Sequence, residues 1–149
     1  QASQAGSITD SFYYRKPGGD YYEYVDFSKV FGFDHSVEGE FIFLKDNAPV
    51  SQTWTSIPVA DFIGGVAVSG YVQMTILAKA VSVTSIPGYN NFPDVIKVQY
   101  QYIITGNPAP VLTQQRWFAK NAGEIYFSSD NGTVNTIYVV SDNPPYQVH

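Results

Sequence analysis

Apolar and polar residues alternate along much of the chain with a period of two, the period of a β-strand. In the stretch DVIKVQYQYIITG, apolar and aromatic residues alternate with Lys97, Gln99 and Gln101. Because successive side chains of a strand point to opposite faces, we expect one face of this strand to pack and the other to meet water. The pattern therefore predicts a strand that lies half buried in a sheet.

Further strands are predicted where runs of Val, Ile, Thr, Tyr and Phe lie between Gly, Pro and Asn. Two of these runs are YYEYVDF (21–27) and GEFIFLK (39–45). In the segment 69–93 we expect two strands, one around residues 72–76 and a second over residues 81–86. The spacing between turn signals is short and even, which favours a meander or barrel-like sheet over βαβ units.

Helix signals are limited to two short segments. DFSKVFGF (26–33) has an Asp at an N-cap position, and PVADFIGG (58–65) has an early Pro and a final Gly pair. We therefore expect an all-β fold, a strongly curled antiparallel sheet (a half-barrel or barrel-like meander) of roughly eight to ten strands with at most one or two short helices. Residues 1–149 are expected to form a single β domain, with 1–10 as a flexible N-terminal segment and 141–149 as a C-terminal tail.

The stretch RWFAKNAGEIYFSSDNGTVNTIYVV carries two turn signals. Asn131 and Gly132 lie between two β runs, and Asn-Gly is the pair that best tolerates the positive φ angles of a two-residue type I′ turn. Such a turn would set Tyr126 opposite Ile137. Upstream, Gly123 ends the small residues of AKNAG, and small residues with a Gly in a strand run mark a bulge, a tight bend or a close backbone approach. We favour a bend of the sheet at Gly123.

Charge narrows the range of partners. The chain has 8 Lys and Arg against 13 Asp and Glu, a formal net charge of -5. Phosphate backbones are bound through clustered cations, so a nucleic acid is a disfavoured partner, and an anionic membrane surface is disfavoured for the same reason. The chain has no Cys, and no run approaches the ~20 apolar residues of a membrane span.

The chain starts QASQAGSITD, a small and polar beginning without Met. Such a start is typical of a mature sequence from which an export leader has been removed, although an arbitrary starting point would look the same. We expect an exported protein, located in the periplasm, at the cell surface or outside the cell. A lipid anchor outside this chain and the oligomeric state stay open.

Known catalytic motifs are missing from the sequence. It has no G-x-S-x-G elbow and no P-loop, and only His35 and His149 could act as imidazole bases. Glu38 and Glu40 share the face of a predicted strand, but adjacent carboxylates are far commoner on solvated strands than in glycoside hydrolases. Loops with one Asp each supply too few oxygens for calcium. We predict no catalytic residue, no metal site and no cofactor.

Aromatic residues are the feature that points to a ligand. They make up 16% of the chain. Trp54 lies in the polar stretch SQTWTSIP and Trp117 adjoins an Arg, and exposed rings of this kind stack sugars. A curled sheet lined by residues such as Tyr100 and Tyr102 could instead hold an apolar ligand. The alternative is that these four rings fill the core.

The stretch WFAKNAGEIYF resembles a strand–Gly–strand motif, Tyr-(Phe/Ala)-Ala-x-x-x-Gly-(aliphatic/polar)-(Ile/Val), of exported bacterial cell-envelope proteins, many of them lipoproteins. The stretches FPDVIKVQYQY and SFYYRKPGGDYYEY are similar to further strands of that family. The resemblance implies a half-barrel similar in outline to periplasmic lipoprotein carriers. It implies no catalytic residue, because most members have no assigned biochemical role. The lipidated Cys typical of the lipoproteins is not in this chain.

Three functions remain open from the sequence. The first is a non-catalytic secreted or cell-envelope domain that binds an apolar or lipid-like ligand in the curve of its sheet, and we prefer it. The second is a carbohydrate-binding or adhesion module that uses exposed aromatic residues. The third is a structural or interaction domain without a small ligand.

Overall fold

The structure, a computed structural model, describes residues 12–16, 18–84, 91–120, 123–131 and 135–139, and in these ranges it has ten strands and one short helix. The elements are β1 (Phe12–Lys16), β2 (Asp20–Asp26), α1 (Ser28–Phe31), β3 (Glu38–Lys45), β4 (Thr53–Thr55), β5 (Val59–Ile63), β6 (Val66–Val83), β7 (Phe92–Ile104), β8 (Leu112–Ala119), β9 (Gly123–Asp130) and β10 (Asn135–Val139). The prediction of an all-β antiparallel fold with at most one or two short helices is confirmed.

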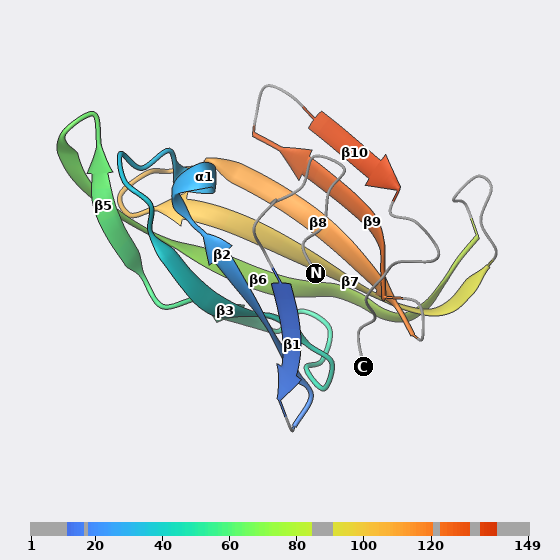
Figure 1. Cartoon of the computed structure of the whole chain (residues 1–149). Coiled ribbons are helices and arrows are strands. Elements are labelled where there is room, and N and C mark those ends of the chain that lie inside the picture. The colour runs from blue at the N-terminus through green and yellow to red at the C-terminus, as the bar shows by residue number, and fades with distance from the viewer. Residues whose placement is uncertain (1–11, 17, 85–90, 121–122, 132–134, 140–149) are drawn as a thin grey trace.

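The strands form two sheets (Figure 1). The smaller sheet has the order β1-β2-β3, and the larger has the order β10-β9-β8-β7-β6-β4, with β5 also paired to β6. Neither sheet is closed or strongly curled, so the predicted half-barrel is replaced by two open sheets. No helix in the described ranges is long and apolar enough to cross a membrane.

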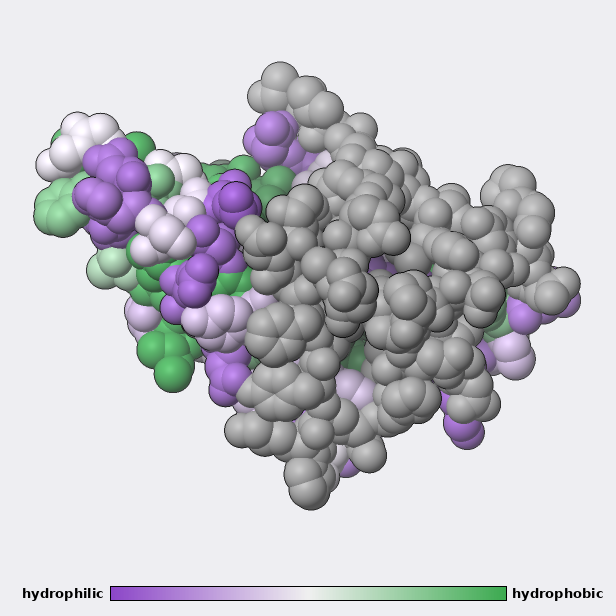
Figure 2. All heavy atoms as spheres, viewed as in Figure 1, coloured by the Kyte–Doolittle hydropathy of each residue, from purple (hydrophilic) through white to green (hydrophobic). Residues whose placement is uncertain are grey.

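The main core lies between the two sheets and explains why neither sheet has to curl on itself. A second, smaller cluster is formed within the larger sheet by Val83, Val95, Ala119 and Ile125. Each sheet covers the apolar face of the other, as in other two-layer β folds. The smaller sheet and its adjoining helix contribute Tyr21, Val25, Phe27, Phe31, Phe41, Phe43 and Leu44, and the larger contributes Val72, Met74, Ile76, Val98, Tyr100, Tyr102 and Phe118. On the side of the smaller sheet, hydrophobic and hydrophilic residues are mixed at the surface near β5 (Figure 2).

One of the two predicted helices is present. The segment 26–33 forms α1, which ends at Gly32 with a φ of 79°. The segment 58–65 is instead strand β5 and a hairpin turn, because Gly64 and Gly65 have φ angles of 58° and 82° and connect Ile63 to its partner Val66. A Gly pair with two positive φ angles makes a tight hairpin turn, so the predicted helix stop at this pair is wrong.

The two strands expected within residues 69–93 are one strand. β6 runs for 18 residues, and its pairing with β7 shifts register at three places between Ile76 and Val83. Ala80, with a φ of 53°, lies in this irregular part. Bulges of this kind let a strand continue through a local break in the hydrogen-bond ladder. The sequence pattern had predicted that one strand ends at this break and another begins.

The predicted hairpin between β9 and β10 forms with a different register. Asp130 pairs with Asn135, so the connection has four residues (131–134) instead of two, and Tyr126 faces Val139 instead of Ile137. A register shift of two residues keeps the predicted parity of the strand pairing, because the strand period is two. Gly132, the segment 1–10 and the tail 141–149 lie outside the described residues.

Candidate functional site

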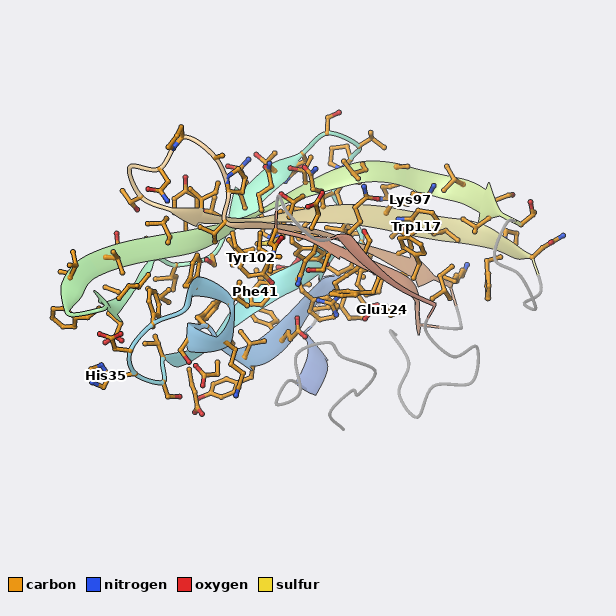
Figure 3. The ribbon with its side chains drawn as sticks, turned by 90° about the horizontal axis from the view of Figure 1, so that it is seen from above. His35, Phe41, Lys97, Tyr102, Trp117 and Glu124 are labelled. Carbon is orange, nitrogen blue, oxygen red and sulfur yellow. The ribbon has the colours of Figure 1, made fainter. Side chains whose placement is uncertain are left out.

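Tyr100 and Tyr102, two of the predicted ligand-binding residues, lie in the core. Tyr100 is 0% exposed and Tyr102 is 2% exposed. Figure 3 shows Tyr102 near Phe41 between the sheets. The Tyr100 hydroxyl donates to the carbonyl oxygen of Phe43 at 2.7 Å, and the Tyr102 hydroxyl donates to Oε1 of Gln114 at 3.2 Å. Burial raises the pKa of both hydroxyls above the usual range, so both stay protonated and act as donors. These two rings fill the space between the sheets.

A buried cluster of three charged residues joins the two sheets. Arg116 on β8 donates from Nη1 to Oε1 of Glu23 at 2.9 Å and from Nη2 to Oε1 of Glu124 at 3.1 Å. Glu23 belongs to β2 of the smaller sheet, whereas Glu124 belongs to β9 beside Arg116. Burial raises the pKa of Glu124, although the neighbouring Arg116 acts in the opposite direction. The cluster therefore holds two carboxylates on one guanidinium.

Aromatic rings enclose this guanidinium. The Arg116 Cζ atom lies 5.0 Å from the ring centroid of Phe43 and 5.3 Å from those of Tyr100 and Phe118. The arrangement favours a role in aligning the sheets, because a charge cluster packed among core rings is hardly accessible to a substrate. The cluster was not expected from the sequence. Glu23 has the strand parity of buried Tyr21, however, and a charged residue at an otherwise apolar position is the signal that could have revealed it.

Trp54 is half buried on β4 at the edge of the larger sheet. Its indole Nε1 donates to the carbonyl oxygen of Ile42 on β3 at 2.8 Å, and its ring packs against the core. The Lys45 ammonium lies 5.9 Å from the ring centroid. Trp54 therefore ties the edge of one sheet to the edge of the other and does not stand out as a free platform.

Trp117 lies on the outer face of the larger sheet, which is the face turned away from the smaller sheet. Its ring stacks on Tyr126 with centroids 4.0 Å apart, and the Lys97 ammonium lies 3.9 Å from the Trp117 centroid. Figure 3 shows Lys97 and Trp117 on the opposite side of this sheet from Phe41. Both broad faces of the indole are thus occupied by neighbours from β7 and β9, and at its edge Nε1 donates to Oε1 of Gln115 at 3.2 Å.

Beside this stack, the outer face carries two rows of uncharged polar side chains, which we call the polar face. Each row consists of residues that pair with one another on neighbouring strands. The first row crosses five strands and the second crosses four. The first row is Thr53, Thr75, Gln99, Gln115 and Ser128, and the second is Thr55, Gln73, Gln101 and Thr113. On β9 the partner of Thr113 is Asp130, an exposed acidic residue that borders the second row at this end. In the described part of the chain, no hydrogen bond joins the side chains of Gln73, Gln99 or Gln101 to another residue.

The small residues of AKNAG connect β8 to β9. Ala119 pairs with Gly123 across a hairpin, and Gly123 has a φ of 87°. A register shift follows at once, because Phe118 pairs with Glu124 while Trp117 pairs with Tyr126. Gly123 is thus placed at a tight bend and beside a bulge. Asn131, the first residue of the next connection, is exposed after β9.

The acidic and imidazole groups of the sequence analysis lie apart from the polar face. His35 is exposed, and its Nδ1 atom lies 3.2 Å from Asp61. Glu38 and Glu40 are exposed on β3, in the smaller sheet. Among the residues that the structure describes, no group of three or more His, Cys, Asp or Glu is placed to hold a metal ion.

Comparison of the chain with protein-family models, with curated proteins and with solved structures finds no match. The likeness to the exported cell-envelope family therefore stays a hypothesis that rests on the motifs alone. What the chain does has to be argued from its own surface.

Proposed function

We propose that this chain is a non-catalytic binding domain that holds an uncharged glycan on the polar face of its larger sheet. The observation that carries the proposal is the composition of the two rows. Nine neighbouring side chains are Thr, Gln or Ser, and a charged residue, Asp130, follows only at the β9 end of the second row. Solvated sheet faces usually carry Lys, Glu and Arg, so this face differs in character from the rest of a chain with 21 charged residues, 8 basic and 13 acidic.

The side chains of the polar face match the hydrogen-bonding needs of sugar hydroxyls. Each glutamine amide offers two donors and an acceptor, and each Thr or Ser hydroxyl can donate and accept. A sugar hydroxyl likewise donates and accepts, so the two sets of groups are complementary without any charge. An anionic ligand would lack cationic partners here, since one charged residue beside the rows, Asp130, is acidic and the other, Lys97, is held over the Trp117 ring.

This choice reverses the order of preference taken from the sequence. An apolar ligand in the curve of the sheet would need Tyr100 and Tyr102 as an accessible lining, and both are buried. Trp54 and Trp117, the other two predicted ligand-binding residues, have neighbours on their rings or indole nitrogen. The polar residues between them are now the preferred contacts. Export and a cell-envelope location stay predictions.

A glycan array that includes neutral and acidic glycans tests the proposal. We expect neutral glycans to bind, and the double variant Gln99→Leu/Gln101→Leu to bind them about 10- to 30-fold more weakly, because two hydrogen bonds of about 1 kcal/mol each are lost. Asn107→Leu changes an exposed amide in the turn after β7 and is the matched control, which should bind like the wild type. Silence toward every neutral glycan, or an unchanged affinity of the double variant, would overturn the proposal.

A further inference from the structure

The polar face is much longer across the strands than along them. Residues of one row sit on neighbouring strands, which are about 4.8 Å apart, so the five residues of the first row span about 19 Å. The two rows are two residues apart along each strand, which is about 7 Å. The long axis of the face is therefore perpendicular to the strands.

Bulky side chains border the polar face on both long sides. On one side lie Lys97, Trp117 and Tyr126, which form the next row of strand partners and stack on one another. On the other side Tyr71 pairs with Ile103, one row beyond Gln73 and Gln101. The ligand is thus offered Thr, Ser and Gln side chains between Lys97 and two aromatic rings on one side and Tyr71 and Ile103 on the other. This border favours a ligand that follows the rows.

We infer that the glycan lies across the strands as an extended, unbranched, neutral chain of at least four sugar units, an inference that rests on the proposed function. A pyranose linked through opposite ring carbons advances along its chain by about one strand spacing. Successive units then meet the same kind of contact on successive strands, from Thr53 at the β4 edge to Ser128 on β9. A single terminal sugar would use only a fraction of the two rows.

The direction of the ligand can be tested with variants at different places on the face. Gln99 lies at the centre of the first row and Thr53 at its end, whereas Asn107 lies off the rows in the turn beyond the end of β7. If the ligand crosses the strands, Gln99→Leu weakens the binding of short and long chains alike. Thr53→Val then weakens only the long chains.

Calorimetry with unbranched neutral β-linked oligosaccharides of two to six units is the measurement. We expect the affinity to rise at least tenfold between two and five units, and Thr53→Val to remove about threefold from the longest chain while Asn107→Leu removes nothing. An affinity that is already complete at two units, or a loss in Asn107→Leu equal to that in Thr53→Val, overturns the inference and leaves the proposed function standing. Absence of binding to every oligosaccharide overturns both.

Discussion

Arg116 is a buried residue that connects the two sheets, and the sequence pattern does not single it out. It is 5% exposed and balances two carboxylates, Glu23 and Glu124, one from each sheet. A buried ion pair gives little net stability compared with apolar residues of the same shape, because both charges lose their water. Removing one partner is a different matter, since the remaining charges are then buried without compensation.

We predict that Arg116→Met lowers the free energy of unfolding by about 3 to 5 kcal/mol, because it leaves two buried carboxylates without their cation. Glu124→Gln is the matched control, which keeps an oxygen acceptor for Arg116 and leaves one cation facing one carboxylate. Urea unfolding at pH 7 measures both. A loss of stability in Arg116→Met no larger than that in Glu124→Gln would contradict a charge-balancing role.

The difference in stability between Glu124→Gln and the wild type should depend on pH, and its direction follows from the pKa of Glu124. The pKa of Glu124 is raised in the folded state from its ordinary value of 4.5, so its contribution to stability is fully present below that pH and is lost as the pH rises through the folded pKa. Glu124→Gln removes this loss. The variant should therefore gain stability relative to the wild type as the pH rises from 4 to 7, and a constant difference would show that Glu124 is ionised normally.

At the scale of elements, the β8–β9 hairpin depends on the backbone of Gly123. Its φ of 87° is a conformation that side chains resist. We predict that Gly123→Ala destabilises the protein by about 1 to 2 kcal/mol. Gly39→Ala on β3 is the control, because Gly39 has no positive φ and an added methyl would make an ordinary contact of 3.5 Å with Phe27. Thermal melts that shift equally for both variants would show that the bend at Gly123 carries no strain.

The elements were the most predictable level of this structure. Period-two alternation identified β7 and its buried face, and the two aromatic runs identified β2 and β3. The Gly64–Gly65 pair could not be assigned from its letters, because a helix stop and a hairpin turn both use Gly. The polar face was missed for a different reason. Gln99 and Gln101 looked like an ordinary wet side of a strand, and only pairing with Gln73 and Gln115 shows that they form rows.

The division of the strands into two sheets could not be predicted from these elements, because the same strands could form either two packed sheets or one curled sheet. What decides between them is contact between distant segments, such as the hydrogen bond from Trp54 to Ile42 and that from Tyr100 to Phe43. Those contacts make one core out of both sheets. The molecule should therefore unfold as one cooperative unit.

Two single-tryptophan variants test this cooperativity. Trp117→Phe leaves Trp54, which reports on the junction of the two sheets, and Trp54→Phe leaves Trp117, which reports on the outer face. Because the sheets share one core, we expect the fluorescence transition of each variant in urea to coincide with its own circular dichroism transition. Separate midpoints within either variant would mean that the smaller sheet and the larger one unfold independently.

The link between Glu23 and Arg116 also sets an order of events during synthesis. The two residues are 93 positions apart, so β2 leaves the ribosome long before β8. At a synthesis rate of about 5 to 20 residues per second, Glu23 waits about 5 to 20 s for its cation. Until then the smaller sheet has an apolar face with no cover and a carboxylate that cannot be buried. We therefore expect the domain to complete its fold only after β8 has emerged from the ribosome.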